Sequence, residues 1–499
     1  MRLQTMKKLL SCILSLCVLA AVLLLPGCTN KPVDENKTSM FRGLEPDEMI
    51  ITSYLAPWPE YKRDGEVIWN GLEDATAFRY LKEAGINYVE DNNMSFGGST
   101  YEYAKRSLQL AEEAGIMYFM PAYDVIKMDG EILASDEEIK AKLEEMYQYD
   151  SFGGLYFRDE PTSNMFPHIQ KCLEAYNRIK NELGYTDLNV FLNLFPNVTP
   201  GQLSANTDKD MTWEKYIKGL SNTGVEYLSF DKYPIYGLFT NKVSADWFTA
   251  LGTLNAIALE EGKPWMGCVQ VGGGSTSYGT PEARVTTEGE MKWDVNTMLA
   301  FGAKGITYYI GVAPTYFADK DGEQINCYSL INIYGEKTPL WYYAKDINEH
   351  IKAMDHILLN CDYKGVIITG NTPTVHYGKD LIKENSFRDL NGVTGNALVG
   401  CFDYNGKTAL YVVNNSITEE GQINLTFDYK YSFEVIQDAA SRTENGDSLT
   451  LDLGIGEAAL VVLESRDLTM TIVIVSVVAA LLGAGIVVAI VVVKKRKKK

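Results

Sequence analysis

The chain has 499 residues, 46% of them hydrophobic, and a formal net charge of −19. This length exceeds that of one ordinary domain and allows a large buried core. The acidic balance disfavours a nucleic-acid partner. The four histidines have no metal-ligand spacing and no CxxC pair is present, so we expect no metal and no cofactor.

The first 28 residues have the layout of a secretory signal, with a basic start, an apolar run from Leu9 to Leu25 and small residues at the end. The segment closes with Leu-Pro-Gly-Cys, which resembles the lipobox of bacterial lipoproteins. This resemblance makes Cys28 the candidate lipidation site, with an ordinary signal peptide as the alternative. Residues 29–47 are mostly polar and predict a linker.

From residue 48 to residue 359 one pattern recurs: a helix that ends in Gly, an apolar strand and a polar loop. Glycine ends helices because it readily adopts the left-handed conformation, and near-continuous apolar strands are typical of a parallel sheet covered on both faces. Eight strands are expected, beginning near Ile50, Ile86, Ile116, Gly154, Asn189, Val225, Pro264 and Gly305. Eight strand–helix units predict an α/β fold, the (β/α)8 TIM barrel. An open doubly wound sheet is the alternative, although no GxGxxG motif follows the first strand.

The rest of the chain predicts a second domain and a membrane anchor. Residues 360–467 form short β-rich runs separated by Gly, Asn and Asp turns, which predicts a small antiparallel β-sandwich. Residues 468–493 carry no charge and are long enough for a transmembrane helix, and residues 494–499 are all basic. Because basic tails stay in the cytoplasm, we expect the barrel on the extracellular face of a cell membrane, with membrane lipid as a partner through Cys28 and this helix.

The fourth predicted strand ends in Asp159-Glu160-Pro161, at the end of the barrel where active sites lie. Side chains alternate along a strand, so the two carboxylates are expected to point differently, one into the mouth and one toward a neighbouring strand. A Glu among apolar and aromatic groups keeps its proton, which suits a general acid. A solvated loop acid or a charge at a helix amino terminus is the alternative.

This strand end resembles that of glycoside hydrolases with (β/α)8 barrels, and the Asp-Glu pair is similar to that of family 123, the substrate-assisted N-acetylgalactosaminidases. The resemblance implies that Glu160 is the acid/base and that Asp159 orients the acetamido group of the substrate. Asp231 lies in an Asp-Lys-Tyr-Pro sequence, which resembles a turn of galactosidase-like barrels. It is the next candidate catalytic carboxylate.

The seventh predicted strand departs from the largest clan of retaining enzymes, which carry a nucleophilic Glu at its end. Gln270 stands there instead, and a retaining mechanism with two carboxylates needs the second acid about 5 Å from the first. Three options remain: substrate assistance through Asp159, inversion with Asp231 as the base, or a site that binds without cleaving.

Aromatic and polar side chains crowd the predicted mouth. Aromatic faces stack on pyranose rings, and pockets combine such surfaces with a few placed polar groups. The candidate substrate-binding residues are Tyr54, Trp58, Asn92, Asn93, Tyr123, Asp124, Asn193, Tyr233, Tyr236, Trp265 and Gln270. We therefore predict an extracellular, membrane-tethered glycoside hydrolase acting on a glycan, with an N-acetylhexosaminide as one candidate substrate. The alternative is a non-catalytic carbohydrate-binding surface protein that uses the same mouth; a solute-binding lipoprotein ranks last, because it predicts a two-lobed fold.

Overall fold

The computed structural model describes residues 38–92, 100–126, 134–236, 242–273, 284–315, 329–370 and 378–466. The predicted signal segment with Cys28 and the predicted transmembrane segment 468–493 lie outside these residues. Within the described part of the chain, no helix is both long and apolar enough to cross a membrane. Export, lipidation and membrane insertion therefore stay predictions.

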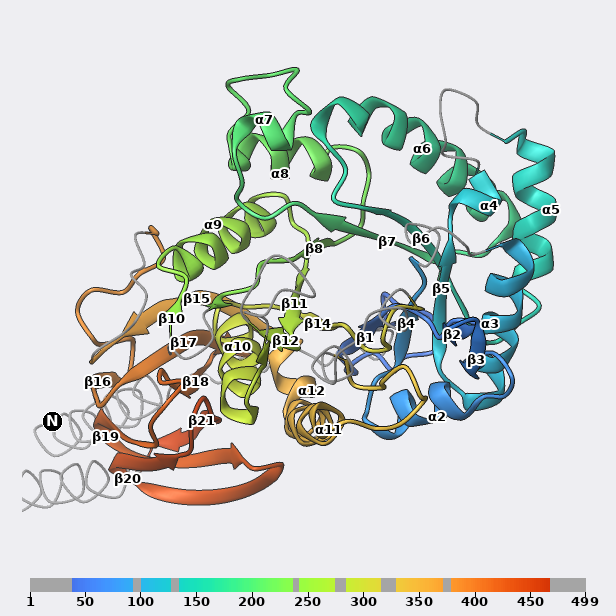
Figure 1. Ribbon diagram of the computed structural model, residues 1–499. Coiled ribbons are helices and arrows are strands. Elements are labelled where there is room, and N and C mark those ends of the chain that lie inside the picture. Colours follow the sequence, from blue (N-terminus) through green and yellow to red (C-terminus); the bar gives the residue numbers. More distant parts are fainter. Residues whose placement is uncertain are drawn as a thin grey trace, which may run out of the picture.

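Eight parallel strands close into a barrel (Figure 1). The strands are β1 (Ile50–Tyr54), β4 (Tyr88–Glu90), β5 (Met117–Pro121), β6 (Phe152–Asp159), β7 (Asn189–Leu194), β8 (Leu228–Phe230), β11 (Trp265–Gln270) and β14 (Gly305–Tyr309). Closure is complete because β1 pairs with β4 on one side and with β14 on the other. The predicted (β/α)8 barrel is confirmed, and the open doubly wound sheet is excluded.

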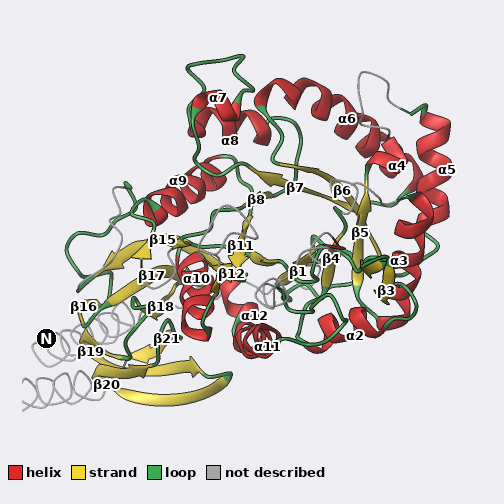
Figure 2. Cartoon of the chain, in the orientation of Figure 1, coloured by secondary structure: helices red, strands yellow, loops and turns green. Residues whose placement is uncertain are grey.

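Helices surround the barrel as an outer layer (Figure 2). They are α2 (Thr76–Glu83), α3 (Tyr101–Ala114), α4 (Tyr123–Ile126), α5 (Asp136–Met146), α6 (Phe166–Leu183), α7 (Pro200–Leu203), α8 (Trp213–Ser221), α9 (Trp247–Glu260), α10 (Glu288–Ala300), α11 (Pro339–Lys352) and α12 (Asp355–Leu358). The glycine signals read from the sequence do end helices: Gly115 follows α3 and Gly184 follows α6, each in the left-handed conformation.

The amino-terminal end of the barrel is closed by aromatic side chains. The Phe41 ring packs edge-on against Tyr88 and Tyr227, with centroid distances of 6.0 and 5.1 Å. Asn189 Nδ2 at the start of β7 donates a hydrogen bond to the Met40 carbonyl, which holds the segment in place. These contacts fill the end of the barrel where the strands begin.

The second domain is one seven-stranded antiparallel sheet. Its strands are β15 (Cys361–Ile368), β16 (Leu390–Thr394), β17 (Ala397–Tyr404), β18 (Lys407–Asn414), β19 (Gly421–Gln437), β20 (Ala440–Leu453) and β21 (Ala458–Arg466). The first half of β19 pairs with β16 and its second half with β21, with a register shift in its pairing with β20 between Thr426 and Tyr431. The antiparallel domain is confirmed, but the long β19 makes its sheet continuous where a sandwich has two.

Helix α10 joins the two domains. Its Trp293 is fully buried, and Nε1 donates to Asn415 Oδ1 in the sheet domain at 3.0 Å. A Cβ atom on Gly400 of β17 would lie 2.4 Å from the Ala300 carbonyl oxygen, so the helix and the sheet touch at backbone distance. The two domains therefore share a packed interface and not only a linker.

Candidate active site

The end of β6 carries Asp159 and Glu160 on a distorted backbone. The pairing of β6 with β7 shifts register between Tyr156 and Arg158, and Glu160 has a φ of 42°, in the left-handed region that non-glycine residues rarely adopt. The Glu160 N–H donates to the Asn193 carbonyl at 3.1 Å, which holds this conformation. Regular alternation is disturbed here: Asp159 contacts Asn193 of the neighbouring strand β7, and Glu160 contacts Asp231 after β8. The different directions expected for the two carboxylates stay a prediction.

Asp159 accepts a hydrogen bond on each carboxylate oxygen. Tyr54 Oη at the end of β1 donates to Oδ2 at 2.9 Å, and Asn193 Nδ2 on β7 donates to Oδ1 at 3.2 Å. Asn92 Nδ2 in turn donates to Tyr54 Oη at 2.6 Å. Burial raises the pKa of Asp159, and the hydrogen bonds from Tyr54 and Asn193 act against that rise. Neutral donors thus fix this carboxylate and stabilise its charge.

Glu160 is half-buried and contacts Asp231, which is buried just after β8. The two carboxyl groups lie close enough for each to affect the pKa of the other. Burial, followed by the negative charge of Asp159, raises the pKa of Glu160 to about 7. Burial and the neighbouring Glu160 raise the pKa of Asp231 well above its ordinary value. The pair therefore holds a proton near neutral pH.

Glu90 is a further carboxyl group near this cluster, and it was not among the predicted site residues. It ends β4, is fully buried, and accepts a hydrogen bond from the Thr52 hydroxyl of β1. Burial raises the pKa of Glu90 to about 8, and the charge of Asp159 acts in the same direction. Glu90 is therefore neutral at neutral pH. The signal that could have found it was its position as the last residue of the second strand.

Gln270 ends β11, where retaining enzymes carry a nucleophilic carboxylate. Both ends of its side-chain amide form hydrogen bonds. Nε2 donates to the Ile235 carbonyl at 2.7 Å, and Oε1 accepts from the Ile235 N–H at 2.8 Å. The Gln270 N–H donates to Asp294 Oδ2 on α10 at 2.8 Å. The amide thus holds the segment that follows β8, and its contact with substrate stays a prediction.

Three tyrosine rings form a wall of the mouth. The Tyr309 ring at the end of β14 lies between those of Tyr54 and Tyr233, with centroid distances of 5.1 and 5.0 Å. Tyr54 and Tyr233 were predicted, whereas Tyr309 was not, although its strand was. Such a wall offers flat apolar faces to a sugar ring.

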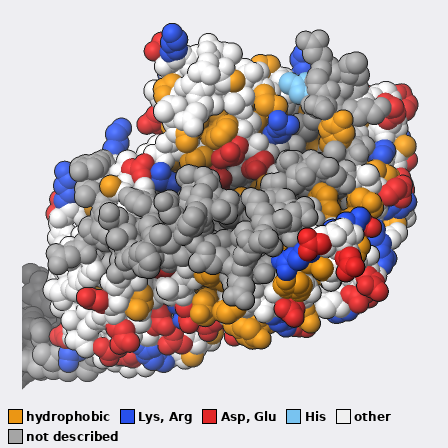
Figure 3. Space-filling view, viewed as in Figure 1, with side chains coloured by type: hydrophobic (Ala, Val, Ile, Leu, Met, Phe, Trp, Pro, Cys, Tyr) orange, Lys and Arg blue, Asp and Glu red, His pale blue; other side chains and the backbone are white. Residues whose placement is uncertain are grey.

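The three carboxyl groups of Asp159, Glu160 and Asp231 make the mouth acidic, and no ion pair among the described residues neutralises them. In the view of Figure 3, acidic side chains lie near the centre of the face. Lys232, next to Asp231 in the chain, pairs with Asp246 at 3.1 Å. Among the ion pairs of the described residues, none involves Asp159, Glu160 or Asp231. The same part of the chain holds no group of His, Cys, Asp and Glu arranged to bind a metal ion.

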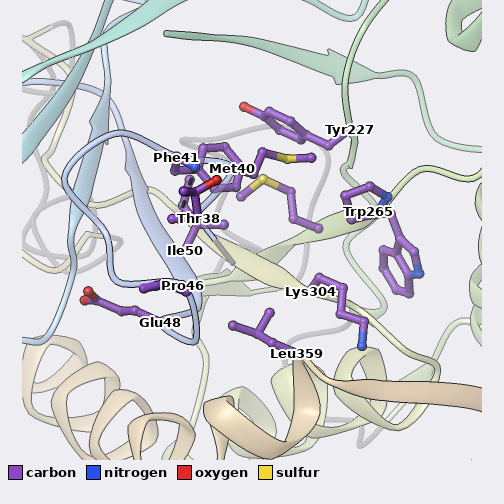
Figure 4. Close-up of a pocket in the computed structure, with 13 residues that line it drawn as sticks. Thr38, Met40, Phe41, Pro46, Glu48, Ile50, Tyr227, Trp265, Lys304 and Leu359 are labelled. Atoms are coloured by element: carbon purple, nitrogen blue, oxygen red, sulfur yellow. Dashed lines mark hydrogen bonds between the residues drawn. The ribbon is translucent and has the colours of Figure 1, made fainter. Parts of the chain in front are cut away.

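Trp265 does not lie at the mouth, contrary to its prediction. It is the first of the six residues of β11, at the closed end of the barrel, and its Nε1 donates to Asn255 Oδ1 of α9 at 2.9 Å. Figure 4 shows its side chain beside a cavity of about 280 Å³ that Met40, Phe41 and Lys304 also line. The sequence assigned Trp265 to the correct strand, but Trp265 begins that strand and so lies at the end of the barrel away from the site.

The other predicted binding residues are less central. Trp58 is half-buried and precedes the hairpin of β2 (Tyr61–Arg63) and β3 (Glu66–Trp69), and Tyr123 is exposed at the start of α4. Asn93 lies outside the described residues. The same holds for the side chains of Asp124 and Tyr236.

The closed barrel of eight parallel strands, with two adjacent carboxylates at the end of its fourth strand, is a (β/α)8 fold. No protein-family model matches the chain, and no curated protein matches it in sequence.

Solved structures do match. A β-galactosidase from Bacillus circulans sp. alkalophilus superposes with a TM-score of 0.51 at 10% identity, covering 84% of this chain and 99% of that one. α-Galactosidase I from Mortierella vinacea gives 0.43 at 10% identity, covering 84% and 98%. A β-galactosidase from the psychrophilic Marinomonas ef1 gives 0.39 at 10% identity, covering 64% of this chain and 63% of that one. At 10% identity, the match to the Bacillus circulans structure supports the fold and nothing beyond it.

Proposed function

We propose that this protein is a glycoside hydrolase that cleaves 2-acetamido sugars by substrate assistance. The observation that carries the proposal is the arrangement of Asp159 and Glu160: adjacent residues, both in the mouth, one fixed by two neutral donors and the other holding a proton near neutral pH. Such a pair needs no third carboxylate on the protein, because the substrate supplies the nucleophile.

The chemistry follows from these positions. Glu160 gives its proton to the glycosidic oxygen while the acetamido oxygen of the sugar bonds to C1, and the C1–O bond breaks. Asp159 accepts a hydrogen bond from the acetamido N–H and stabilises the positive charge of the resulting oxazolinium ring. Water then attacks C1 and gives a proton to Glu160, the ring opens to the acetamide, and the product keeps its configuration.

Asp231 as the base of an inverting mechanism is the alternative. In inverting enzymes the two carboxyl groups are about 6.5–9.5 Å apart, and in retaining enzymes about 5–5.5 Å. Asp231 and Glu160 affect each other's pKa. In the proposal Asp231 shares the proton of the pair.

A non-catalytic glycan-binding protein is the second candidate, favoured by Gln270 at the place of the strand-seven carboxylate. None of the ion pairs among the described residues involves Asp159 or Glu160, which supports the hydrolase instead.

Turnover of aryl glycosides by the full chain in detergent separates the two candidates. We expect release of the phenol from a 2-acetamido-2-deoxy-hexoside and none from the matching hexoside with a 2-hydroxyl group, because only the former carries the internal nucleophile. Binding of the acetamido sugar without any turnover would favour the binding protein.

We also propose that the protein is held at the outer face of a membrane through Cys28 and residues 468–493. Thr38, the first described residue, lies beside the cavity at the closed end of the barrel, so a tether there leaves the mouth free. We expect the chain in the membrane fraction, and we expect release only when Cys28→Ala is combined with removal of residues 468–499. Release by either change alone would show that the attachment left in place does not suffice.

A further inference from the structure

We propose that Asn193 is a positioning residue that sets the geometry of Asp159 and Glu160, and not a contact for the sugar as its sequence position suggested. The inference deepens the proposed hydrolase function and rests on it for its kinetic test.

One residue contacts both Asp159 and Glu160. Asn193 is buried on β7, and its Nδ2 donates to Asp159 Oδ1 at 3.2 Å. Its main-chain carbonyl accepts the Glu160 N–H at 3.1 Å and so holds the left-handed backbone of that residue.

The orientation of the amide is determined by its neighbours. A carboxylate can only accept, so the NH2 group must face Asp159. Ser229 Oγ on β8 donates to Asn193 Oδ1 at 3.1 Å, which fixes the opposite side of the amide. The amide is therefore held on both sides by protein groups.

The neutral Asn193 amide affects the pKa of the carboxyl groups beside it. Asn193 stabilises the ionised forms of Asp159 and Asp231 against the cost of burial, and it does so without a charge of its own that would attract the proton away from Glu160. Removing it should raise the pKa of Asp159, so that Asp159 becomes protonated at a higher pH than in the wild type.

The kinetic test compares Asn193→Ala with the wild-type chain on an aryl 2-acetamido glycoside. We expect kcat to fall about 10- to 100-fold with KM within about twofold, and the acid limb of kcat/KM to move to higher pH. If Asn193 only binds sugar, its substitution should instead raise KM and leave the acid limb of kcat/KM where it is in the wild type. That result would overturn the proposal.

Two further variants separate positioning from general loss of structure. Asn189 is also a buried asparagine of β7, but it contacts Met40 at the closed end. Asn189→Ala should lower stability without moving the acid limb. Ser229→Ala should move the limb in the same direction as Asn193→Ala but less far, because the amide keeps its hydrogen bond to Asp159. A limb that moves equally in Asn189→Ala would contradict the assignment.

A titration that needs no turnover keeps the inference independent of the proposed activity. The infrared band of protonated carboxyl groups is followed with pH in wild type, Asn193→Ala, and Asn193→Ala combined with Asp159→Asn. We expect the band to persist to higher pH in the single variant and this excess to disappear in the double variant. An unchanged titration overturns the role of Asn193, whereas absence of turnover with a changed titration overturns only the proposed function.

Discussion

Glu160→Gln should lower kcat on an aryl 2-acetamido glycoside with a poor leaving group by about 10²–10⁴-fold, the usual contribution of a positioned general acid. The carboxamide is nearly isosteric and fits the same backbone, so the loss reports the missing proton. With a dinitrophenyl leaving group, which departs without protonation, the loss should be much smaller. Steady-state rates for a series of phenols measure this difference.

The pH profile gives a second readout of the same residue. Glu160 must hold its proton for the first step, and its pKa is raised to about 7. In the wild type, kcat/KM should therefore fall as the pH rises through about 7, and this alkaline limb should be missing in Glu160→Gln. Glu174→Gln, at an exposed position of α6, serves as the matched control and should leave both rate and profile unchanged. Equal losses for good and poor leaving groups would argue against an acid role.

Asp159→Asn should reduce kcat by about 10²–10³-fold, similar to the loss of one preorganised electrostatic contact in other active sites. The substitution keeps the shape but removes the negative charge that stabilises the oxazolinium ring. It also gives Tyr54 and Asn193 a weaker acceptor than a carboxylate. Steady-state and single-turnover rates on the aryl 2-acetamido glycoside measure the effect.

Fluorination of the acetamido methyl group tests whether the loss belongs to substrate assistance. Each fluorine makes the carbonyl oxygen a poorer nucleophile, so the wild-type rate should fall stepwise from acetamido to trifluoroacetamido substrates. The variant should show a weaker dependence. A wild-type rate that ignores fluorination would exclude the acetamido group as the nucleophile, whatever the effect of Asp159→Asn.

The barrel could be predicted from the sequence because its signals are local. A glycine that ends each helix and an apolar run that follows it are properties of neighbouring residues, and Gly115 before β5 is an example. The identities of Asp159, Glu160 and Asp231 as mouth carboxylates followed from their places at strand ends.

What the sequence could not give depends on contacts between distant elements. The register shift in β6 disturbs the alternation expected for Asp159 and Glu160. The engagement of Gln270 depends on the main chain of Ile235, 35 residues away. Trp265 was assigned to the correct strand, but its end of that strand depends on where pairing with β8 begins, at Leu228.

The position of α10 makes the structure of the mouth depend on the second domain. One face of this helix carries Trp293 into the sheet domain, and the next residue, Asp294, holds the N–H of Gln270 at the end of β11. A chain that stopped at residue 359 would expose an aromatic face of the barrel and loosen the support of its seventh strand. The two domains thus form one structural unit. Exchanging either domain for a counterpart from another protein would require redesign of the helix between them.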